Sequence, residues 1–449
     1  MSDVTAAAGM QRIPLLRQVM RLRNDSLLRN SLFLMATNAL TSGLGYIYWV
    51  VAVRTYTASD VGLVSAVIST MTLTSLICNL GFTPALFQTL ARRSPGHDWS
   101  LTLNTSFLVT TITSLAGAFV VLLLFQASPE FSTVAQNSGF AAAFLVSVPI
   151  WTVGNLIDAT FQAERDSGKV LTRNAAFAIL KMLLLFGFVP LHVGGIGIFL
   201  SWVLGCALSL YIGIRLLRRM DRQYTPVFRG AFREARSMLS SLIGHHFISI
   251  GGALPFYLLP VIVTARLSAE DNAYFYTTWM LGTLFAIVSV AVAQSLFAEG
   301  AHAGTHLLKS MQRSILIIVA LLAPIMAVFF IFGGQILSIF GPNYPLRGLE
   351  LLHLLTIATV PDAITSVYIS VLRTQHRLRE AAILNILMAF IVLIVAWFLL
   401  PTMGIAAVGW GWFISQLVGT VIVVVDFVIT RRTRRDTLWA EVAPETIPA

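Results

Sequence analysis

One lysine lies in the middle of an otherwise apolar segment. The stretch RNAAFAILKMLLLFGFVP, residues 173–190, carries Lys181 as its one internal charge. An ammonium group is costly to bury among apolar side chains, so its presence needs a reason. Three reasons are open: Lys181 faces a polar groove and binds an anionic ligand, its long side chain reaches the inner headgroups, or it pairs with a buried acid. The first would make it a ligand-binding residue.

Two carboxylates inside other apolar runs are the candidate partners. Asp158 lies near the inner end of the run 139–160, and Asp362 follows Pro361 within the run 349–372. Acids inside membrane-spanning segments are often proton or ion relays, so both are candidates for coupling to a proton or sodium gradient. A solvated helix terminus explains Asp158 equally well.

Further polar side chains in apolar runs are candidates to line a groove, with hydrogen bonding between helices as the alternative: Asn38, Asn79, Asn155 and Gln294.

Two arginines end apolar runs at corresponding sites. Arg54 is followed by Asp60, and Arg266 is followed by Asp271. A local ion pair that holds each loop is one interpretation. A cationic rim for an anionic ligand is the other.

The composition places these residues in a membrane protein. Hydrophobic residues make up 57% of the 449 residues and charged residues only 11%, against about 25% charged residues in soluble domains. A bilayer core needs about 20 helical residues, and an open sheet would leave backbone groups unpaired in lipid. We therefore expect an all-α integral membrane protein with twelve spans: 31–53, 61–86, 101–125, 139–160, 171–190, 195–215, 237–263, 273–297, 311–333, 349–372, 381–400 and 404–429.

The basic residues support this count. With the N-terminus in the cytoplasm, 26 of the 30 lysines and arginines fall on inside segments, as expected of cytoplasmic loops. Both termini are then cytoplasmic. The net charge of +10 is explained by this orientation signal, so nucleic acid is not expected as a partner.

An internal repeat organises the chain. FQAERDSGKVLTRN (161–174) matches LRTQHRLREAAILN (372–385), and RTYTASDVGLV (54–64) matches ARLSAEDNAYF (265–275), both at an offset of 211 residues. Trp202 and Trp412 differ by 210. Six spans per half give both halves the same orientation, so we expect two parallel six-helix lobes around a central cavity, as in parallel-repeat transporters.

Basic residues dominate the segment between the halves. Arg229, Arg233 and Arg236 follow helical spacing, with Phe228 and Phe232 on another face, which predicts an amphipathic helix on the anionic inner leaflet. A solvated tether is the alternative. The expected organisation is a basic cytoplasmic segment, a first lobe, a basic cytoplasmic link, a second lobe and a cytoplasmic tail: 1–30, 31–215, 216–236, 237–430 and 431–449.

Catalytic and metal-binding signals are weak. The sequence contains no Walker motif, nucleophile elbow or cluster of metal ligands, and Cys78 and Cys206 both fall within predicted spans. The outer connections are short, whereas membrane glycosyltransferases, polymerases and ligases usually carry long outer loops. We therefore expect a transporter without a cofactor rather than an enzyme.

Two stretches near the start of the chain resemble a known protein family. WVVAVRTYTASDVGLVSAVIST (49–70), followed by LICNLGFTPALFQTLAR (76–92), is similar to the start of the bacterial polysaccharide flippases of the Wzx type, relatives of the MATE exporters and lipid II flippases. The shared features are the Ala52-Val53-Arg54 step, Asp60 before the second span, and the turn Asn79-Leu80-Gly81.

This resemblance implies transport of a lipid-linked oligosaccharide on a polyprenyl diphosphate from the inner to the outer leaflet. It further implies work beside a polysaccharide polymerase and glycosyltransferases, in contact with membrane lipids. The glycan needs a hydrated groove and the diphosphate needs cations, a role that suits Lys181. A MATE-like, ion-coupled exporter of small molecules or drugs is the alternative.

Overall fold

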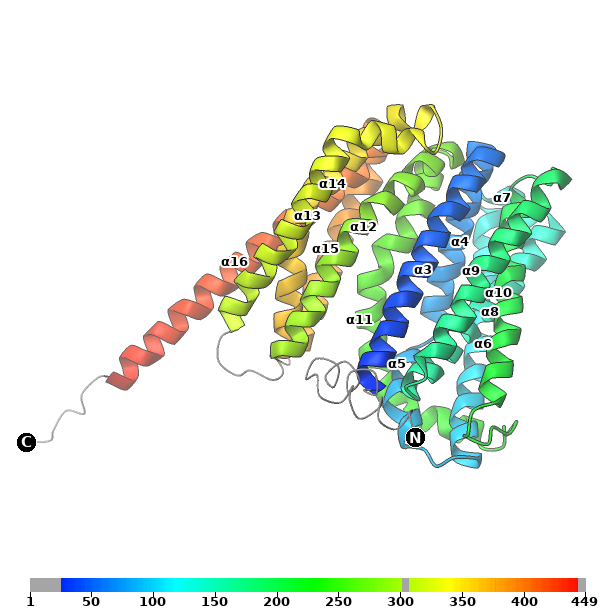
Figure 1. Ribbon diagram of the computed structural model, residues 1–449, viewed down its shortest axis with the longest axis horizontal. Coiled ribbons are helices and arrows are strands. Elements are labelled where there is room, and N and C mark those ends of the chain that lie inside the picture. The colour runs from blue at the N-terminus through cyan, green and yellow to red at the C-terminus, as the bar shows by residue number, and fades with distance from the viewer. Residues whose placement is uncertain (1–25, 301–306, 376, 443–449) are drawn as a thin grey trace, which may run out of the picture. The chain divides into compact units, whose positions relative to one another are not determined.

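The computed structural model describes residues 26–300, 307–375 and 377–442 (Figure 1). Every regular element in these residues is a helix, which confirms the predicted all-α class. The chain divides into two compact units, Met1–Ile250 and Gly251–Ala449, and the boundary falls inside one helix, α11. The predicted basic segment 1–30 lies largely outside the described residues, whereas residues 431–442 of the predicted tail continue helix α16.

The first unit is built around α8 and α9. Helix α8 contacts α4, α5, α6 and α10, and α9 contacts α3 and α10. The helices of this unit are α3 (Ser26–Thr55), α4 (Ala58–Cys78), α5 (Phe82–Thr89), η1 (Leu90–Arg92), α6 (His97–Gln126), α7 (Ser132–Gln136), α8 (Ser138–Ala163), α9 (Ser167–Phe188), η2 (Val189–Leu191), α10 (Gly195–Arg218) and the first part of α11 (Ala231–Arg266).

The second unit is built around α14. This helix contacts α12, α13 and α16, and α15 packs against α16. Besides the remainder of α11, the helices are α12 (Ala269–Gly300), α13 (Leu307–Ser338), α14 (Asn343–Thr374), α15 (Leu378–Met403) and α16 (Ala406–Val442).

Many of these helices suit a bilayer. Among the described residues, nine helices are long and apolar enough to cross a membrane: α4, α6, α8, α9, α10, α13, α14, α15 and α16. A shorter apolar stretch, Ile250–Arg266, belongs to α11. Each predicted span overlaps one long helix, while the count of twelve spans and the lobe boundaries remain predictions.

The predicted second span, 61–86, is interrupted. Helix α4 ends at Cys78 and α5 begins at Phe82, because Leu80 and Gly81 have φ values of 51° and 85°. Only glycine adopts this left-handed region without a steric cost, which suits Gly81 to the turn. Asn79 bridges the break, since its Oδ1 accepts the backbone N–H of Thr83 at 3.0 Å.

The predicted amphipathic helix of the link is wrong for residues 219–230, whereas Phe232, Arg233 and Arg236 are helical, at the start of α11. Residues 219–230 are not helical, and the helix that follows is the first part of α11. Hydrogen bonds hold the link to α6: Asn104 Nδ2 donates to the carbonyl oxygens of Thr225 and Val227 at 2.9 and 3.1 Å. Tyr224 donates its hydroxyl to Asn104 Oδ1 at 2.8 Å, and burial raises the pKa of this phenol. The polar side chains of α6 therefore take the place of the missing helical hydrogen bonds.

The internal repeat recurs in the helix boundaries. Helices α4 and α12 begin at Ala58 and Ala269, and α10 and α16 begin at Gly195 and Ala406. Both pairs differ by 211 residues, the offset found in the sequence. The same offset separates the starts of α9 and α15 and the ends of α8 and α14.

The repeat also preserves a helix cap. The hydroxyl of Thr57 accepts the N–H of Asp60 at 3.1 Å and donates to its carboxylate at 2.7 Å. Ser268 makes the same two bonds with Asp271, at 3.0 and 2.8 Å. Both helices thus begin with a reciprocal cap. Asp60 does more than its counterpart, because its second oxygen accepts the N–H of Gly195 at 2.8 Å.

Because of this additional hydrogen bond, Asp60 should contribute more to stability than Asp271. Asp60→Ala and Asp271→Ala should each keep the backbone part of the cap but lose the hydrogen bond from the Thr57 or Ser268 hydroxyl and the negative charge at the helix start, at a cost of about 0.5–1.5 kcal/mol. Asp60→Ala should cost about 1–3 kcal/mol more, because it also leaves the N–H of Gly195 unpaired. Thermal unfolding of the detergent-solubilised variants measures both losses. Equal losses would contradict the bridging role of Asp60.

Candidate functional site

Lys181 lies deep inside the first unit. Its side chain belongs to α9 and the residue is 4% exposed. Helix α9 begins at Ser167, four residues earlier than the predicted span. Lys181 is therefore about 21 Å along the helix from Ser167 at 1.5 Å per residue. Its side chain is buried inside the unit, and its reach to the inner headgroups remains a prediction.

Aromatic rings surround the ammonium group. Lys181 Nζ lies 4.0 Å from the ring centroid of Trp202, 4.8 Å from that of Phe177 and 5.0 Å from that of Tyr48. We call these three rings, contributed by α10, α9 and α3, the aromatic cage. The negative face of an aromatic ring attracts a cation, and more strongly where water is excluded. The rings thus stabilise the charge without neutralising it.

The cage is held in place by its neighbours. Tyr48 Oη donates to the carbonyl oxygen of Ile198 at 3.0 Å and hydrogen-bonds Ser201 Oγ at 2.9 Å. Helices α9 and α10 approach closely at Gly205, where a Cβ atom would lie only 3.0 Å from the backbone nitrogen of Lys181. Trp202 Nε1 is buried and has no hydrogen-bond acceptor among the described residues.

No acid shares the cage. In the part of the chain that the structure describes, Lys181 has no carboxylate within 4.0 Å. Asp158 instead forms a bidentate pair with Arg173, whose Nε donates to Oδ1 at 2.6 Å while Nη2 donates to Oδ2. Asn174 Nδ2 also donates to Asp158 at 2.8 Å. The interpretation that Lys181 pairs with Asp158 is therefore wrong, whereas pairing with Asp362, which belongs to the second unit, remains a prediction.

Arg173 is itself a correction. It is one of the 26 basic residues assigned to inside segments, but it lies in α9 and is 5% exposed. Its side chain packs against two glycines: a Cβ atom at Gly154 or Gly213 would lie 3.0 or 2.9 Å from the guanidinium arm. The Asp158–Arg173 pair therefore joins α8 to α9 beneath α10. This structural role is sufficient to explain a buried acid at position 158. A role of Asp158 in ion coupling remains a prediction.

Asp362 lines a small cavity in the second unit. The cavity has a volume of about 30 Å³ and is lined by Phe256, Trp279, Gly282, Thr283, Leu355, Thr359, Asp362 and Trp412. Gln416 Nε2 donates to Asp362 Oδ1 at 2.9 Å, and Thr365 Oγ1 donates to Gln416 Oε1 at 2.7 Å. A carboxylate beside hydroxyls and rings has the right chemistry for a proton or a small cation, and the space suits a water-sized ligand.

The amide candidates take different positions. Asn38 is exposed on α3, and Asn155 is half-buried on α8. Asn79 is 8% exposed and serves the break between α4 and α5. The backbone of Gln294 belongs to α12, but its side chain lies outside the described residues. No contact of Lys181 in the described part of the first unit involves Asn38, Asn79 or Asn155, and the role of all four amides in binding remains a prediction.

Both candidate rim arginines are exposed at helix ends. The guanidinium carbon of Arg266 lies 4.6 Å from the ring centroid of Trp397. Among the described residues, Arg266 has no carboxylate within 4.0 Å, so its predicted ion pair with Asp271 is wrong. Asp60 binds Thr57 and Gly195, as its place in the cap requires. A cationic rim at Arg54 and Arg266 remains a prediction.

The cage itself was missed in the sequence. Phe177 precedes Lys181 by four residues, one helical turn, and this spacing was a readable signal. Tyr48 and Trp202 are distant in sequence and meet Lys181 only through tertiary packing.

The sequence model of a family described as polysaccharide biosynthesis protein matches residues 27–297. The chain belongs to this family. This result confirms the family predicted from the sequence. No curated protein sequence matches the chain.

Solved structures share its fold. The inward closed conformation of the lipid II flippase MurJ has a TM-score of 0.70 at 13% identity, covering 87% of this chain and 86% of that one. An inward-facing multidrug resistance MATE transporter of the MOP superfamily has a TM-score of 0.64 at 15% identity, covering 90% and 96%.

A MOP superfamily transporter from Pyrococcus furiosus, described as having a binding pocket of reversed polarity, has a TM-score of 0.59 at 16% identity, covering 88% and 93%. At these identities the likeness shows the fold alone, and it confirms the predicted MATE-like class of a multi-pass membrane protein.

The buried ion pair can be tested against the second half of the repeat. That half carries Ile369 and Leu384 at the positions of Asp158 and Arg173. Arg173→Leu alone should lower the free energy of unfolding by about 3–5 kcal/mol, because the buried acid loses its partner. Adding Asp158→Ile should restore most of the loss, since the pair of apolar residues already occurs in the other half. Thermal unfolding in detergent is the measurement, and failure of the double variant to recover would contradict a purely structural pair.

Proposed function

We propose that the protein moves a lipid-linked oligosaccharide from the inner to the outer leaflet of the bacterial cytoplasmic membrane by alternating access of its two halves. The observation that carries the proposal is the family match over residues 27–297. Support comes from the fold, which is shared with a lipid II flippase. Both termini are taken as cytoplasmic, and a polymerase and glycosyltransferases are the proposed partners in the pathway.

The physics of the substrate explains why a protein is needed. Each hydroxyl that loses its hydrogen bonds in hydrocarbon costs about 4–8 kcal/mol, so a glycan cannot cross lipid unaided. Its diphosphate carries negative charge that must be matched by cations along the path. The chain belongs to a polysaccharide biosynthesis family and shares the fold of a transporter, and both features fit the transport of a glycan.

Lys181 is the proposed diphosphate ligand. Its ammonium is buried in the aromatic cage without a carboxylate partner among the described residues. The N–H of Trp202 beside it is also without an acceptor in that part of the chain. Two neighbouring donors that lack an anionic or carbonyl partner are suited to a phosphate oxygen, which accepts strong hydrogen bonds from ammonium groups.

A second candidate function rests on Asp362. An acid in a water-sized cavity beside Phe256, Trp279 and Trp412 suits a proton or a small coupling cation, since rings and a carboxylate both attract positive charge. A MATE-like exporter driven by a proton or sodium gradient would use such a site.

Deletion of the gene separates the two functions. Loss of a flippase should make lipid-linked glycan accumulate on the inner leaflet and should abolish the surface polymer. Lipid-linked intermediates are measured by extraction and chromatography, and polymer by surface staining. Unchanged polymer in a strain without a redundant flippase, with raised sensitivity to cationic dyes, would favour the exporter.

Substitutions of Lys181 test its role directly. Lys181→Gln and Lys181→Met should abolish export while the protein still inserts, because both remove the charge. Lys181→Arg should keep part of the activity. A loss of about one hundredfold in transport of reconstituted lipid-linked glycan corresponds to about 2.7 kcal/mol, the strength of one charged hydrogen bond.

The matched control is Lys169→Met. Lys169 is on the same helix and pairs with Asp166 at 2.5 Å near its inner end. This change removes a cation from α9 outside the cage, so export should persist. Full export by Lys181→Met would rule out Lys181 as a ligand for the diphosphate.

A further inference from the structure

Two phenylalanine side chains near the start of α11 are exposed on the protein surface. Phe228 is 53% exposed and Phe232 is 84% exposed. Arg229, Arg233 and Arg236 are exposed as well. We call these five residues the link patch. Large rings left uncovered beside three positive charges are unusual for a surface that faces only water.

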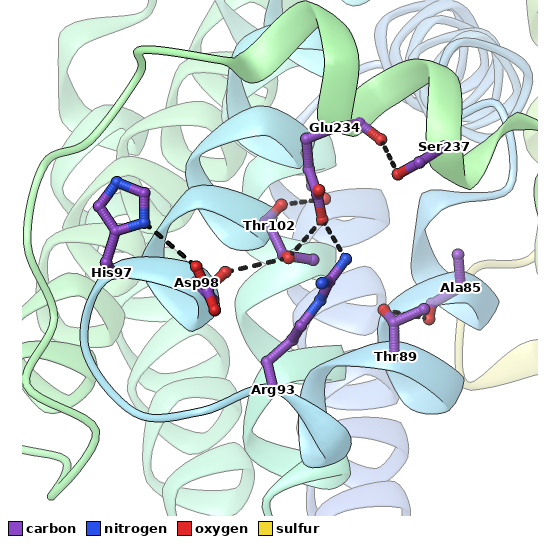
Figure 2. Close-up of polar contacts among 9 residues, drawn as sticks. Ala85, Thr89, Arg93, His97, Asp98, Thr102, Glu234 and Ser237 are labelled. Atoms are coloured by element: carbon purple, nitrogen blue, oxygen red, sulfur yellow. Dashed lines mark hydrogen bonds and ion pairs between the residues drawn. The ribbon is translucent and has the colours of Figure 1, made fainter.

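The opposite side of this segment is fixed to the first unit. Ala231 and Met238 are 8% and 3% exposed. The carboxylate of Glu234 accepts a hydrogen bond from Arg93 Nη2 at 2.6 Å and another from Thr102 Oγ1 at 2.6 Å (Figure 2). Glu234 is thereby neutralised by Arg93. The link patch keeps its three positive charges, and its residues cannot turn inward without breaking these bonds.

Contacts with α6 fix the depth of the patch. The carbonyl oxygens of Thr225 and Val227 accept from Asn104, and the N–H of Thr225 donates to Ser100 Oγ at 3.0 Å. A Cβ atom at Gly230 would lie 3.9 Å from Leu101. These α6 residues lie in its first turns, just after the charged Asp98 and before a long apolar run. The patch is therefore level with the boundary between water and hydrocarbon.

We propose that the link patch is a docking surface for anionic phospholipid headgroups of the inner leaflet. The three arginines match their negative charge, and each basic residue near an anionic leaflet adds to the attraction. Phe228 and Phe232 enter the acyl boundary beside them, as the apolar face of an interfacial segment does. Phe228 and Arg229 precede helix α11 and the other three residues lie in its first turns, and contacts with α6 and Arg93 hold this segment in place. The proposal depends on the membrane location and not on the transported substrate.

A single label at Phe232 tests the proposal in the full-length protein. The chain's two cysteines, Cys78 and Cys206, are both buried, so Phe232→Cys introduces an accessible thiol for an environment-sensitive fluorophore. The protein is reconstituted into nanodiscs of phosphatidylcholine with or without phosphatidylglycerol. With phosphatidylglycerol we expect a blue shift and a several-fold loss of quenching by aqueous iodide.

Two controls keep the result interpretable. The first is His97→Cys, at a side chain that is 65% exposed on the neighbouring helix start and should remain open to iodide in both lipids. The second combines Phe232→Cys with Arg229→Gln, Arg233→Gln and Arg236→Gln, which should lose the dependence on phosphatidylglycerol. Unchanged thermal unfolding shows that these variants fold.

Three results would overturn the proposal. The label at position 232 remains as open to iodide as the label at position 97 in both lipids. The label is protected equally in neutral and anionic nanodiscs. The label becomes protected only when a membrane extract containing other proteins is added, which would make the patch a protein-docking surface instead.

Discussion

A charge inside a membrane protein must be stabilised by the protein itself, and the first unit meets this constraint in two ways on one helix. Arg173 is matched by a carboxylate in a bidentate pair. Lys181 is surrounded by three rings. The first arrangement yields a neutral pair that joins two helices. The second leaves a net positive charge inside the unit, because rings attract a cation without cancelling it.

The two halves share a frame but differ in charge. Their helix starts and caps recur at an offset of 211 residues, yet the counterpart of Lys181 is Val392, which is 1% exposed. Conversely, Asp362 in the second unit corresponds to Trp151 in the first, where that ring packs 6.2 Å from Trp202. Trp202 accompanies a cation and Trp412, at its offset of 210, accompanies an acid. A duplicated scaffold thus carries opposite polarity at related places, a pattern suited to an anionic group in one half and a cation in the other.

The features predicted correctly from the sequence are those that depend on the composition or spacing of many residues. Spans follow from runs of apolar residues, and the repeat follows from a constant offset, so both agree with the helices. Local backbone geometry was harder: the break at Asn79–Gly81 sits inside an apolar run and is marked only by one glycine. The spacing of the link arginines predicted a helix that in fact begins only at Ala231, because Asn104 donates to the carbonyl oxygen of Thr225 and Ser100 accepts its N–H, which fixes residues 219–230 in another conformation. Such tertiary competition is invisible to spacing arguments.

The functional role of Lys181 was likewise only partly predictable from the sequence. Lys181 was identifiable because a charge in an apolar run is rare. The burial of its side chain, the partners of Asp158 and the rings from two other helices bear on its three interpretations, and none of these features can be read from the sequence. An ion pair at this site would have satisfied the charge and left no attraction for a ligand. A ring cage satisfies stability while the charge remains available, so the aromatic environment makes Lys181 compatible with both a stable fold and an anionic ligand.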